Sequence, residues 1–236
     1  MAEKDYLSGG YIFDYGGTLD TGGCHWGKMI WHAYREEHVP VSEHVFREAY
    51  VYAERELGSK PIIMPDYTFR RTLETKLRIE MEHISSENRT FDPQQWLQKT
   101  LSNLYAKAAA GTKRSRQTLI KVREHCPMVL VTNFYGNMHT VLREFALDDL
   151  FDEVIESATA GVRKPDPRIF TLGVKALGMT AEEVTVVGDS YEKDMVPAHK
   201  AGCRTVWLRG EGWTPQSPSD TSAADMIITR LEEITK

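Results

Sequence analysis

The sequence predicts an α/β fold in which helices cover both faces of a parallel sheet, with an all-helical domain inserted near the N-terminus. Three observations predict it. Short apolar segments alternate with amphipathic helical patterns along most of the chain. Polar residues directly follow several of these apolar segments. One long stretch, from about residue 22 to residue 109, contains helical patterns only.

Six short apolar segments are the predicted strands. The first, residues 11–13, ends in the tight-turn sequence Asp-Tyr-Gly-Gly-Thr, and the fourth, residues 184–187, ends in Gly-Asp-Ser. The other strands are predicted at 128–131, 153–155, 205–208 and 226–228, and helices separate them at about 113–125, 137–146, 167–178 and 192–201. Ligands of such a sheet bind beyond the carboxyl ends of the strands, so we expect the polar residues there to converge.

The insertion contains four predicted helices, at 26–38, 42–57, 67–84 and 93–108, with proline- or glycine-containing stretches between them. We therefore expect a core domain of residues 1–21 and 110–236 and a helical domain of residues 22–109. Because the insertion begins just after the first strand and its turn, it is placed to act as a lid that excludes water and selects the substrate. The alternative is a helical subdomain with no part in catalysis.

Composition limits the classes of function. The chain has 236 residues and is 41% hydrophobic, and its apolar runs are far shorter than the roughly 20 residues of a membrane helix. A formal net charge of −5 without a long Lys/Arg block argues against a nucleic-acid partner. The polar N-terminus lacks the apolar region of a signal peptide, and three scattered cysteines argue against a disulfide framework. We expect a cytoplasmic protein that binds neither membranes nor nucleic acid; the sequence carries no signal for an oligomeric state.

Asp14 is the first candidate for chemistry. It follows the first strand and precedes Gly16, Gly17 and Thr18. A carboxylate at this point can act as a nucleophile or hold a metal ion. The glycines let backbone N–H groups approach an anion closely, and Thr18 adds a hydroxyl donor. The alternative is a turn that happens to carry an acid.

Residues on later loops are candidates for holding an anion. Thr132 and Asn133 follow the second strand, where a hydroxyl and a backbone N–H can hold a phosphoryl oxygen, or where they serve as ordinary cap or loop residues. Lys164 lies in a stretch that prolines stiffen, so its ammonium can be aimed inward. There it would pair with the Asp14 carboxylate and neutralise phosphate charge. The alternative is a solvated surface lysine, and we expect the neighbouring Arg163 to be such a surface residue.

Asp189 and Asp194 are candidates for a metal site. Asp189 follows the fourth strand, and Asp194 lies about one helical turn later. Two carboxylates near a third, that of Asp14, make an oxygen-rich site suited to Mg²⁺. The alternative for Asp194 is an acid at a helix start, where it interacts favourably with the helix dipole.

The order of these motifs resembles that of the haloacid dehalogenase superfamily: Asp-x-x-Gly-Thr, a hydroxyl after a strand, Lys-Pro, then Gly-Asp-x-x-x-x-Asp. The resemblance covers the whole chain, and the helical insertion corresponds to the family's cap. It implies a Rossmann-like core, a covalent aspartyl intermediate and, in the phosphatase branches, one Mg²⁺. It also implies roles for five residues, with Asp14 as nucleophile, Thr132 as phosphate-holding hydroxyl, Lys164 as third-motif lysine, Asp189 as metal ligand and Asp194 in support.

The sequence departs from the family pattern at Gly16. Most phosphatases of the family carry a second aspartate there, which protonates the leaving group and then assists water. The resemblance implies that the metal survives, because this position contributes a backbone carbonyl, whereas a missing general acid/base typically costs ~10²–10⁴-fold in rate. Asp20, Cys24 and His25 follow the turn and are candidate replacements, since histidine in particular titrates near neutral pH. Hinge, capping or surface positions are the alternatives for these residues.

Three functions remain open. The first is a Mg²⁺-dependent phosphatase that acts on a small phosphorylated metabolite through an aspartyl-phosphate. The second is cleavage of a C–P or C–halogen bond, because relatives with these activities also lack the second aspartate. A phosphonatase-type mechanism needs a cap lysine as Schiff base, and the cap lysines that we single out are Lys60 and Lys76. The third is a phosphate-ester-binding protein without turnover.

Substrate selection is expected from side chains of the helical insertion. The candidates that we single out are Trp26, Trp31, Tyr34 and Arg70. At helical spacing such residues are equally typical of packing between helices.

Overall fold

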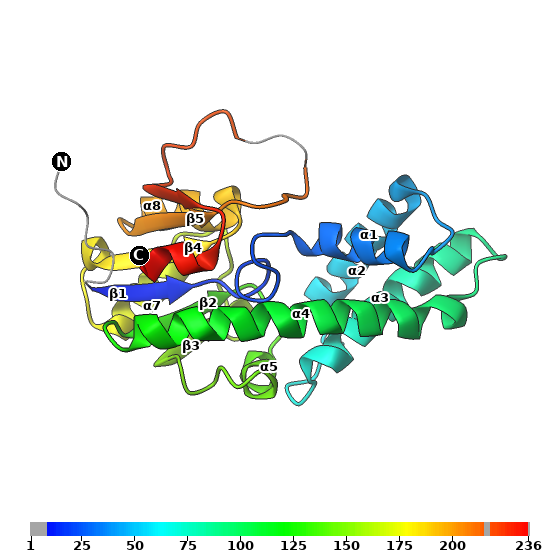
Figure 1. Cartoon of the computed structure of the whole chain (residues 1–236), viewed down its shortest axis with the longest axis horizontal. Helices are drawn as coiled ribbons and strands as arrows, with labels where there is room; N and C mark the ends of the chain where they lie inside the picture. The colour runs from blue at the N-terminus through cyan, green and yellow to red at the C-terminus, as the bar shows by residue number, and fades with distance from the viewer. Residues whose placement is uncertain (1–8, 215–217, 236) are drawn as a thin grey trace.

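The computed structural model of the chain describes residues 9–214 and 218–235 (Figure 1). A six-stranded sheet forms the centre of the core, with strand order β3-β2-β1-β4-β5-β6 and all neighbours parallel. The strands are β1 (Gly10–Phe13), β2 (Met128–Thr132), β3 (Glu153–Glu156), β4 (Val184–Gly188), β5 (Arg204–Leu208) and β6 (Met226–Ile228). Each predicted strand is present, and its ends lie within one residue of the prediction.

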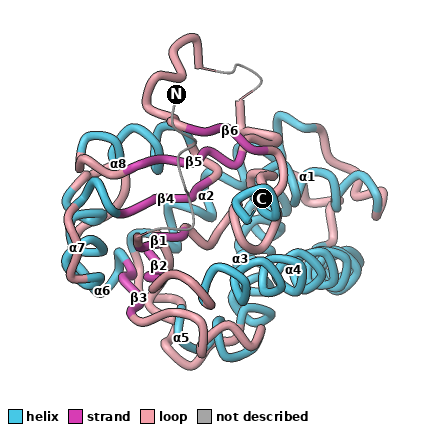
Figure 2. Tube along the Cα trace, turned by 60° about the vertical axis from the view of Figure 1, so that its left-hand side comes forward, coloured by secondary structure: helices cyan, strands magenta, loops and turns pink. Residues whose placement is uncertain are grey.

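Helices pack on both faces of the sheet (Figure 2). Side chains alternate between the two faces along a strand. In β1, Ile12 packs with side chains of α7 and α8, whereas Tyr11 and Phe13 belong to the cluster that contains residues of α4 and α5. These helices are α4 (Pro93–Arg123), α5 (Met138–Glu144), α7 (Arg168–Leu177) and α8 (Val196–Lys200). The expected three-layer, Rossmann-like core with a helical cap is therefore confirmed.

The predicted helix at 192–201 is wrong in detail, because the segment forms two pieces. A π-helical turn, η2 (Tyr191–Met195), precedes the short helix α8. In this wide turn the N–H of Met195 donates to the carbonyl of Ser190, five residues earlier. The shorter elements α6 (Ser157–Ala160), η1 (Ala181–Glu183) and η3 (Leu231–Thr235) were not predicted.

The cap consists of α1 (Trp26–Glu36), α2 (Glu43–Ser59), α3 (Phe69–Glu87) and the first part of α4. Polar side chains begin each of these helices, because they accept hydrogen bonds from backbone N–H groups that have no partner within the helix. The capping residues are His25, Ser42, Thr68 and Asp92. The cap shares one continuous apolar cluster with the core.

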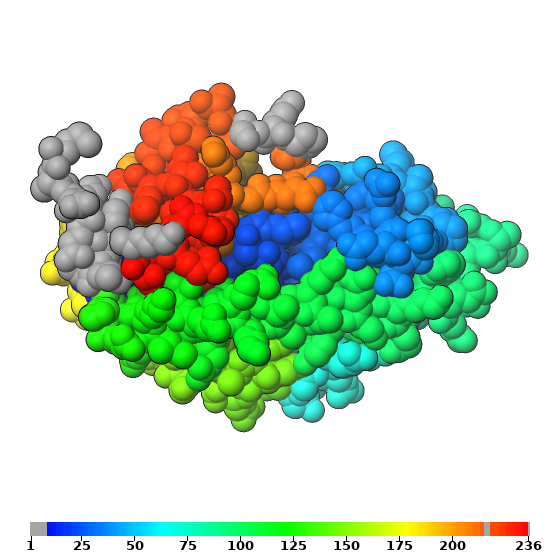
Figure 3. Space-filling model, in the orientation of Figure 1, coloured from blue at the N-terminus to red at the C-terminus, as the bar shows by residue number. Residues whose placement is uncertain are grey.

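Helix α4 corrects a second prediction. The helices predicted at 93–108 and 113–125 are one helix of 31 residues, and the predicted domain boundary at residue 109/110 falls inside it. Gly111 does not end the helix. A Cβ atom at this position would lie 2.1 Å from the carbonyl oxygen of Asp20, so glycine is needed where the helix passes the chain that enters the cap. Figure 3 shows α4, in green, as a continuous ridge from core to cap.

Among residues 9–214 and 218–235, no helix combines the length and the apolar character that crossing a membrane requires. Residues 1–8, on which the expectation of no signal peptide rested, lie outside the described residues.

Candidate active site

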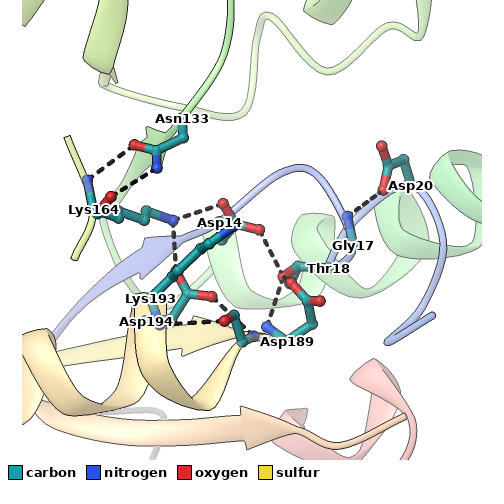
Figure 4. Close-up of polar contacts among 10 residues, drawn as sticks. Asp14, Gly17, Thr18, Asp20, Asn133, Lys164, Asp189, Lys193 and Asp194 are labelled. Carbon is teal, nitrogen blue, oxygen red and sulfur yellow. Dashed lines mark hydrogen bonds and ion pairs between the residues drawn. The ribbon is translucent and has the colours of Figure 1, made fainter. Parts of the chain in front are cut away.

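Three carboxylates meet at the carboxyl ends of the central strands (Figure 4). Asp14 follows β1 and its N–H donates to the carbonyl of Val187 in β4, 3.0 Å away. Asp189 follows β4, and Asp194 lies in the π-helical turn η2. One oxygen from each of the three carboxylates lies within 4.8 Å of the other two. The site occupies the point where the strand order reverses, which is where sheets of this topology bind ligands.

Lys164 connects two of these acids. Its ammonium lies 2.6 Å from Oδ1 of Asp14 and 2.6 Å from Oδ1 of Asp194, and the residue is only 4% exposed. The side chain of Asn133 holds the lysine's backbone in place, since it donates to the Lys164 carbonyl and accepts from the Lys164 N–H, both at 3.0 Å. The Asn133 carboxamide is thus used to position Lys164.

Thr18 links the two strand-end acids. Its hydroxyl lies 2.9 Å from Oδ2 of Asp14 and 3.2 Å from Oδ1 of Asp189, and it accepts the N–H of Asp189 at 3.0 Å. Gly17 has φ +99°, and a Cβ atom there would lie 2.5 Å from the carboxylate of Asp189. Its N–H donates to Oδ1 of Asp20 at 2.8 Å, so this N–H is already used within the turn, contrary to the expectation that it would approach a substrate anion.

The remaining candidates lie at the same edge of the sheet. Thr132 is the last residue of β2 and is 1% exposed. Thr132 lies two residues after Leu130, which is in register with Phe13, the residue that precedes Asp14 on the neighbouring strand β1. Gly16 leaves open space, since a Cβ atom there would meet only Trp26, at 3.9 Å.

Burial and mutual repulsion raise the pKa values of Asp14 and Asp189. Burial raises the pKa of Asp14 to about 6, although the ammonium of Lys164 opposes the shift. Burial, followed by the charges of Asp14 and Asp194, raises the pKa of Asp189 well above its usual range. Burial disfavours the charged form of Lys164, but the neighbouring Asp14 and Asp194 outweigh it and raise the lysine's pKa.

This donor set fits a divalent cation. Three carboxylates share a single buried ammonium, which leaves negative charge uncompensated. Hard carboxylate oxygens are the ligands that Mg²⁺ prefers. Both oxygens of Asp194 already have donors, Lys164 and the N–H of Ser190 at 3.0 Å, so Asp194 is placed to orient the site. Oδ2 of Asp189 accepts no hydrogen bond from a described residue.

The three candidate replacements for the absent second aspartate have structural contacts. Asp20 is fully buried, its oxygens accept from Gly17 and from the Trp26 indole N–H at 2.8 Å, and burial raises its pKa to about 7. His25 accepts the N–H of Gly27 as the N-cap of α1, and burial lowers its pKa to about 4. Burial raises the pKa of the Cys24 thiol to about 11.

Most of the expected specificity residues pack elsewhere. Trp31 and Tyr34 pack against Phe46 inside the cap, with ring centroids 5.3 Å and 5.1 Å away. The guanidinium of Arg70 lies over Tyr105, 5.3 Å from the ring centroid. For these three residues, the helical spacing in the sequence indicates packing between helices.

Sequence reasoning missed a polar contact between cap and core. The hydroxyl of Tyr135, in the loop after β2, lies 3.3 Å from Oε1 of Glu54 in α2, and Lys76 of α3 also bonds to that oxygen. The position of Tyr135, two residues after Asn133, was the one available signal for it. Glu54 had none, because it is one of many charged residues on an amphipathic helix.

The loop after β5 makes a second contact with the cap. The Trp213 ring packs against Tyr50, with centroids 4.8 Å apart, and the Arg47 guanidinium lies 3.8 Å from a ring centroid of the tryptophan. The carbonyl of Glu211 accepts the N–H of His25 at 2.9 Å. In Figure 1 this orange loop reaches toward the blue helices of the cap.

Comparison with known proteins adds three findings. A sequence model of the haloacid dehalogenase-like hydrolases matches residues 10–202. A glyceraldehyde 3-phosphate phosphatase of Pyrococcus furiosus is 32% identical over 123 residues, which make up 51% of this chain and 51% of that protein. A phosphoserine phosphatase of Thermus thermophilus is 37% identical over 84 residues, 36% of this chain and 32% of that protein. The chain thus matches about half of the length of the first relative and about a third of the second.

A solved structure shares the fold over nearly the whole chain. It is a crystal structure of a dehalogenase with an intermediate complex, and it aligns with a TM-score of 0.61 at 20% sequence identity. The alignment covers 97% of this chain and 96% of that one. At this level of identity the likeness concerns the fold alone.

Proposed function

Since the chain belongs to the haloacid dehalogenase-like hydrolases, we propose that it is a Mg²⁺-dependent phosphatase acting on a small phosphorylated metabolite through an aspartyl-phosphate. One observation carries the proposal: the buried Asp14 carboxylate lies between Lys164 and Thr18, within 4.8 Å of two further acids. The phosphatase activities of the relatives from Pyrococcus furiosus and Thermus thermophilus support the reaction class.

In the proposed first step a carboxylate oxygen of Asp14 attacks phosphorus in line with the ester oxygen, the ester P–O bond breaks, and the alcohol departs after taking up a proton. Lys164, already 2.6 Å from that carboxylate, would hold an equatorial phosphoryl oxygen. The Thr132 hydroxyl and the N–H groups of Asn133 and Gly16 are the proposed additional donors. Water then hydrolyses the aspartyl-phosphate and restores the carboxylate.

Asp14, Asp189 and the backbone carbonyl of Gly16 are the proposed holders of Mg²⁺, with Asp194 orienting the site. When bound, the ion would neutralise phosphate charge and the repulsion among the acids. The raised pKa values of Asp14 and Asp189 support this assignment, because buried carboxylates without a compensating charge resist ionisation.

Gly16 has no side chain that could donate a proton to the leaving group. Neither Asp20 nor His25 is available to donate one in its place. Both oxygens of Asp20 are occupied, and His25 is neutral at physiological pH. We therefore propose slow turnover, or substrates whose leaving group needs little protonation. The loss expected from a missing general acid is ~10²–10⁴-fold.

We also propose that residues 1–21 and 110–236 form the core domain and residues 22–109 the cap domain. The cap is the proposed lid, and the contact of Tyr135 with Glu54 places cap side chains beside the loop that carries Thr132. Because α4 crosses from cap to core without a break, this lid is joined to the core by a continuous helix.

A phosphonatase-type mechanism finds no support at Lys60 or Lys76, the two cap lysines singled out from the sequence. Schiff-base chemistry needs a neutral amine. The ammonium of Lys76 is paired with Glu54, whose charge outweighs burial and raises the lysine's pKa. Lys60 is exposed and pairs with Glu56. The third function, binding of phosphate esters without turnover, is suggested by Gly16. An assay of hydrolysis and phosphoenzyme formation distinguishes it from the phosphatase function.

The test is hydrolysis of aryl phosphates and a panel of small phosphate esters with Mg²⁺, together with acid-quench trapping of phosphoenzyme. We expect turnover, with phosphate covalently bound at Asp14, and neither in Asp14→Asn. The control is Asp166→Asn, the same chemical change at a surface carboxylate that pairs with Arg168. Binding of esters with no turnover and no phosphoenzyme in the wild type would refute the phosphatase and leave the binding protein.

A further inference from the structure

Glu54 lies at the contact between cap and core. It lies on α2, and its side chain is 39% exposed. Oε1 accepts from Tyr135, which belongs to the loop that follows β2 and its terminal Thr132. Lys193, which lies between Asp189 and Asp194 in sequence, is one of the positive charges that help hold the pKa of Glu54 down. Glu54 therefore lies beside the loop that follows β2 and its terminal Thr132.

The charge of Glu54 is fixed by a buried partner. Burial alone would raise its pKa, but the ammonium of Lys76 outweighs burial and holds the pKa below the usual range. Lys76 is 7% exposed, bonds to Oε1 and lies 4.4 Å from the ring centroid of Tyr50. Oε2 of Glu54 accepts no hydrogen bond from any described residue. Glu54 thus offers an ionised acceptor with one oxygen open to a ligand.

The surroundings of Glu54 carry aromatic rings. Tyr50 lies one turn earlier on α2. Burial raises the pKa of Tyr50, and the charges of Glu54 and Asp189 contribute to the same shift. The ring of Trp213 lies 4.8 Å from that of Tyr50, and the ring of His25, neutral because burial lowers its pKa to about 4, lies 6.0 Å from it. Aromatic faces beside a carboxylate suit hydroxyl and ammonium groups.

We propose that Glu54 is a specificity-determining residue that receives the leaving group of the substrate. It would favour phosphomonoesters whose leaving group carries a hydroxyl or ammonium donor and disfavour those whose leaving group carries a carboxylate. A hydrogen bond to a charged acceptor gives about 10- to 100-fold discrimination, and an opposed carboxylate adds to it. The proposal rests on the phosphatase function proposed above, since it names the class of leaving group.

The test compares three small esters: glycerol 3-phosphate, ethanolamine phosphate and phosphoglycolate. We expect the wild type, assayed with Mg²⁺, to favour each of the first two over phosphoglycolate by at least about tenfold in kcat/KM. Glu54→Gln should bring these ratios close to one, with the change mainly in KM. The matched control is Glu56→Gln on the same helix, a residue that pairs with Lys60, and it should keep the wild-type ratios.

Two further measurements keep the proposal falsifiable. Glu54→Gln leaves a buried ammonium without its partner, so the double variant Glu54→Gln with Lys76→Met removes both charges and protects the fold. If the wild type hydrolyses no ester, the phosphatase proposal fails, and calorimetric binding of the same three esters still ranks them. A wild-type preference for phosphoglycolate, or ratios unchanged in the double variant, would overturn the assignment of Glu54.

Discussion

Replacement of Gly17 by alanine tests how closely the turn after β1 is fitted to Asp189. Gly17 has φ +99°, a conformation that side chains other than glycine adopt with strain. An added Cβ atom would lie 2.5 Å from three atoms of the Asp189 carboxyl group. Ordinary contact distances for carbon are roughly 3.5 Å. The Asp189 carboxylate must therefore move by about 1 Å, or the turn must shift.

Two effects follow, and they can be separated. Backbone strain at such a position costs about 1–3 kcal/mol of folding stability. Displacement of a reacting or ligating group by about 1 Å typically costs ~10²-fold in function. We therefore expect Gly17→Ala to lose about 10²-fold in kcat/KM, and to bind Mg²⁺ more weakly by a factor on the order of 10–100.

Two neighbouring glycines provide matched controls. Gly22 has φ +67° with nothing within 4 Å of an added Cβ, so Gly22→Ala carries strain alone. Gly16 lacks a strained φ, and its added Cβ would meet only Trp26, at 3.9 Å, so Gly16→Ala carries neither effect. Calorimetric Mg²⁺ titration and thermal unfolding are measured on all three variants. Equal Mg²⁺ affinity in Gly17→Ala and Gly22→Ala would refute the reasoning.

Three further changes have defined outcomes. Gly16→Asp should raise the phosphatase kcat by up to ~10²–10⁴-fold, because it restores a general acid where Trp26 leaves room; a slower variant in the ester assay would contradict this. Lys164→Met should abolish turnover and lower the free energy of unfolding by about 3–5 kcal/mol in urea, because Asp14 loses its buried partner; unchanged stability would count against the ion pair. Glu80→Gln should flatten the dependence of stability on pH. Burial raises the folded-state pKa of Glu80 from 4.5 to about 8, so its contribution is full below pH 4.5 and is lost as pH rises toward 8, at up to ~1.4 kcal/mol per pH unit. Parallel pH profiles for the wild type and this variant would show that Glu80 is ionised when folded.

The sheet and its strand-end acids could be predicted because their signals are local. Most strands are short apolar runs, and Asp14 and Asp189 directly follow β1 and β4. Parallel strands end at one edge of the sheet, so sequence position alone places these carboxylates on the same side of the molecule. The positions of Thr132 and Lys164 suggested roles in holding phosphate, which the family resemblance also implies; these roles remain predictions.

The features that could not be predicted depend on contacts between distant segments. Gly111 resembles a helix break in the sequence, yet it lies inside α4 because the backbone of Asp20 approaches it closely. The π-helical turn η2 is held by backbone hydrogen bonds to the carbonyl of Ser190 and by the Asp194 carboxylate, which accepts the N–H of Ser190. Glu54 and Tyr135 are far apart in sequence, and no spacing pattern relates them. Only the packing of cap against core brings such pairs together.

The central claim is that Asp14 and Asp189 hold one cation at the ends of β1 and β4. The most direct test is anomalous diffraction from crystals grown with Mn²⁺ as a substitute for Mg²⁺. Our account predicts a single strong peak between the two carboxylates, at about 2.0–2.2 Å from one oxygen of each. A peak bound elsewhere, with none between these residues at saturating Mn²⁺, would contradict it.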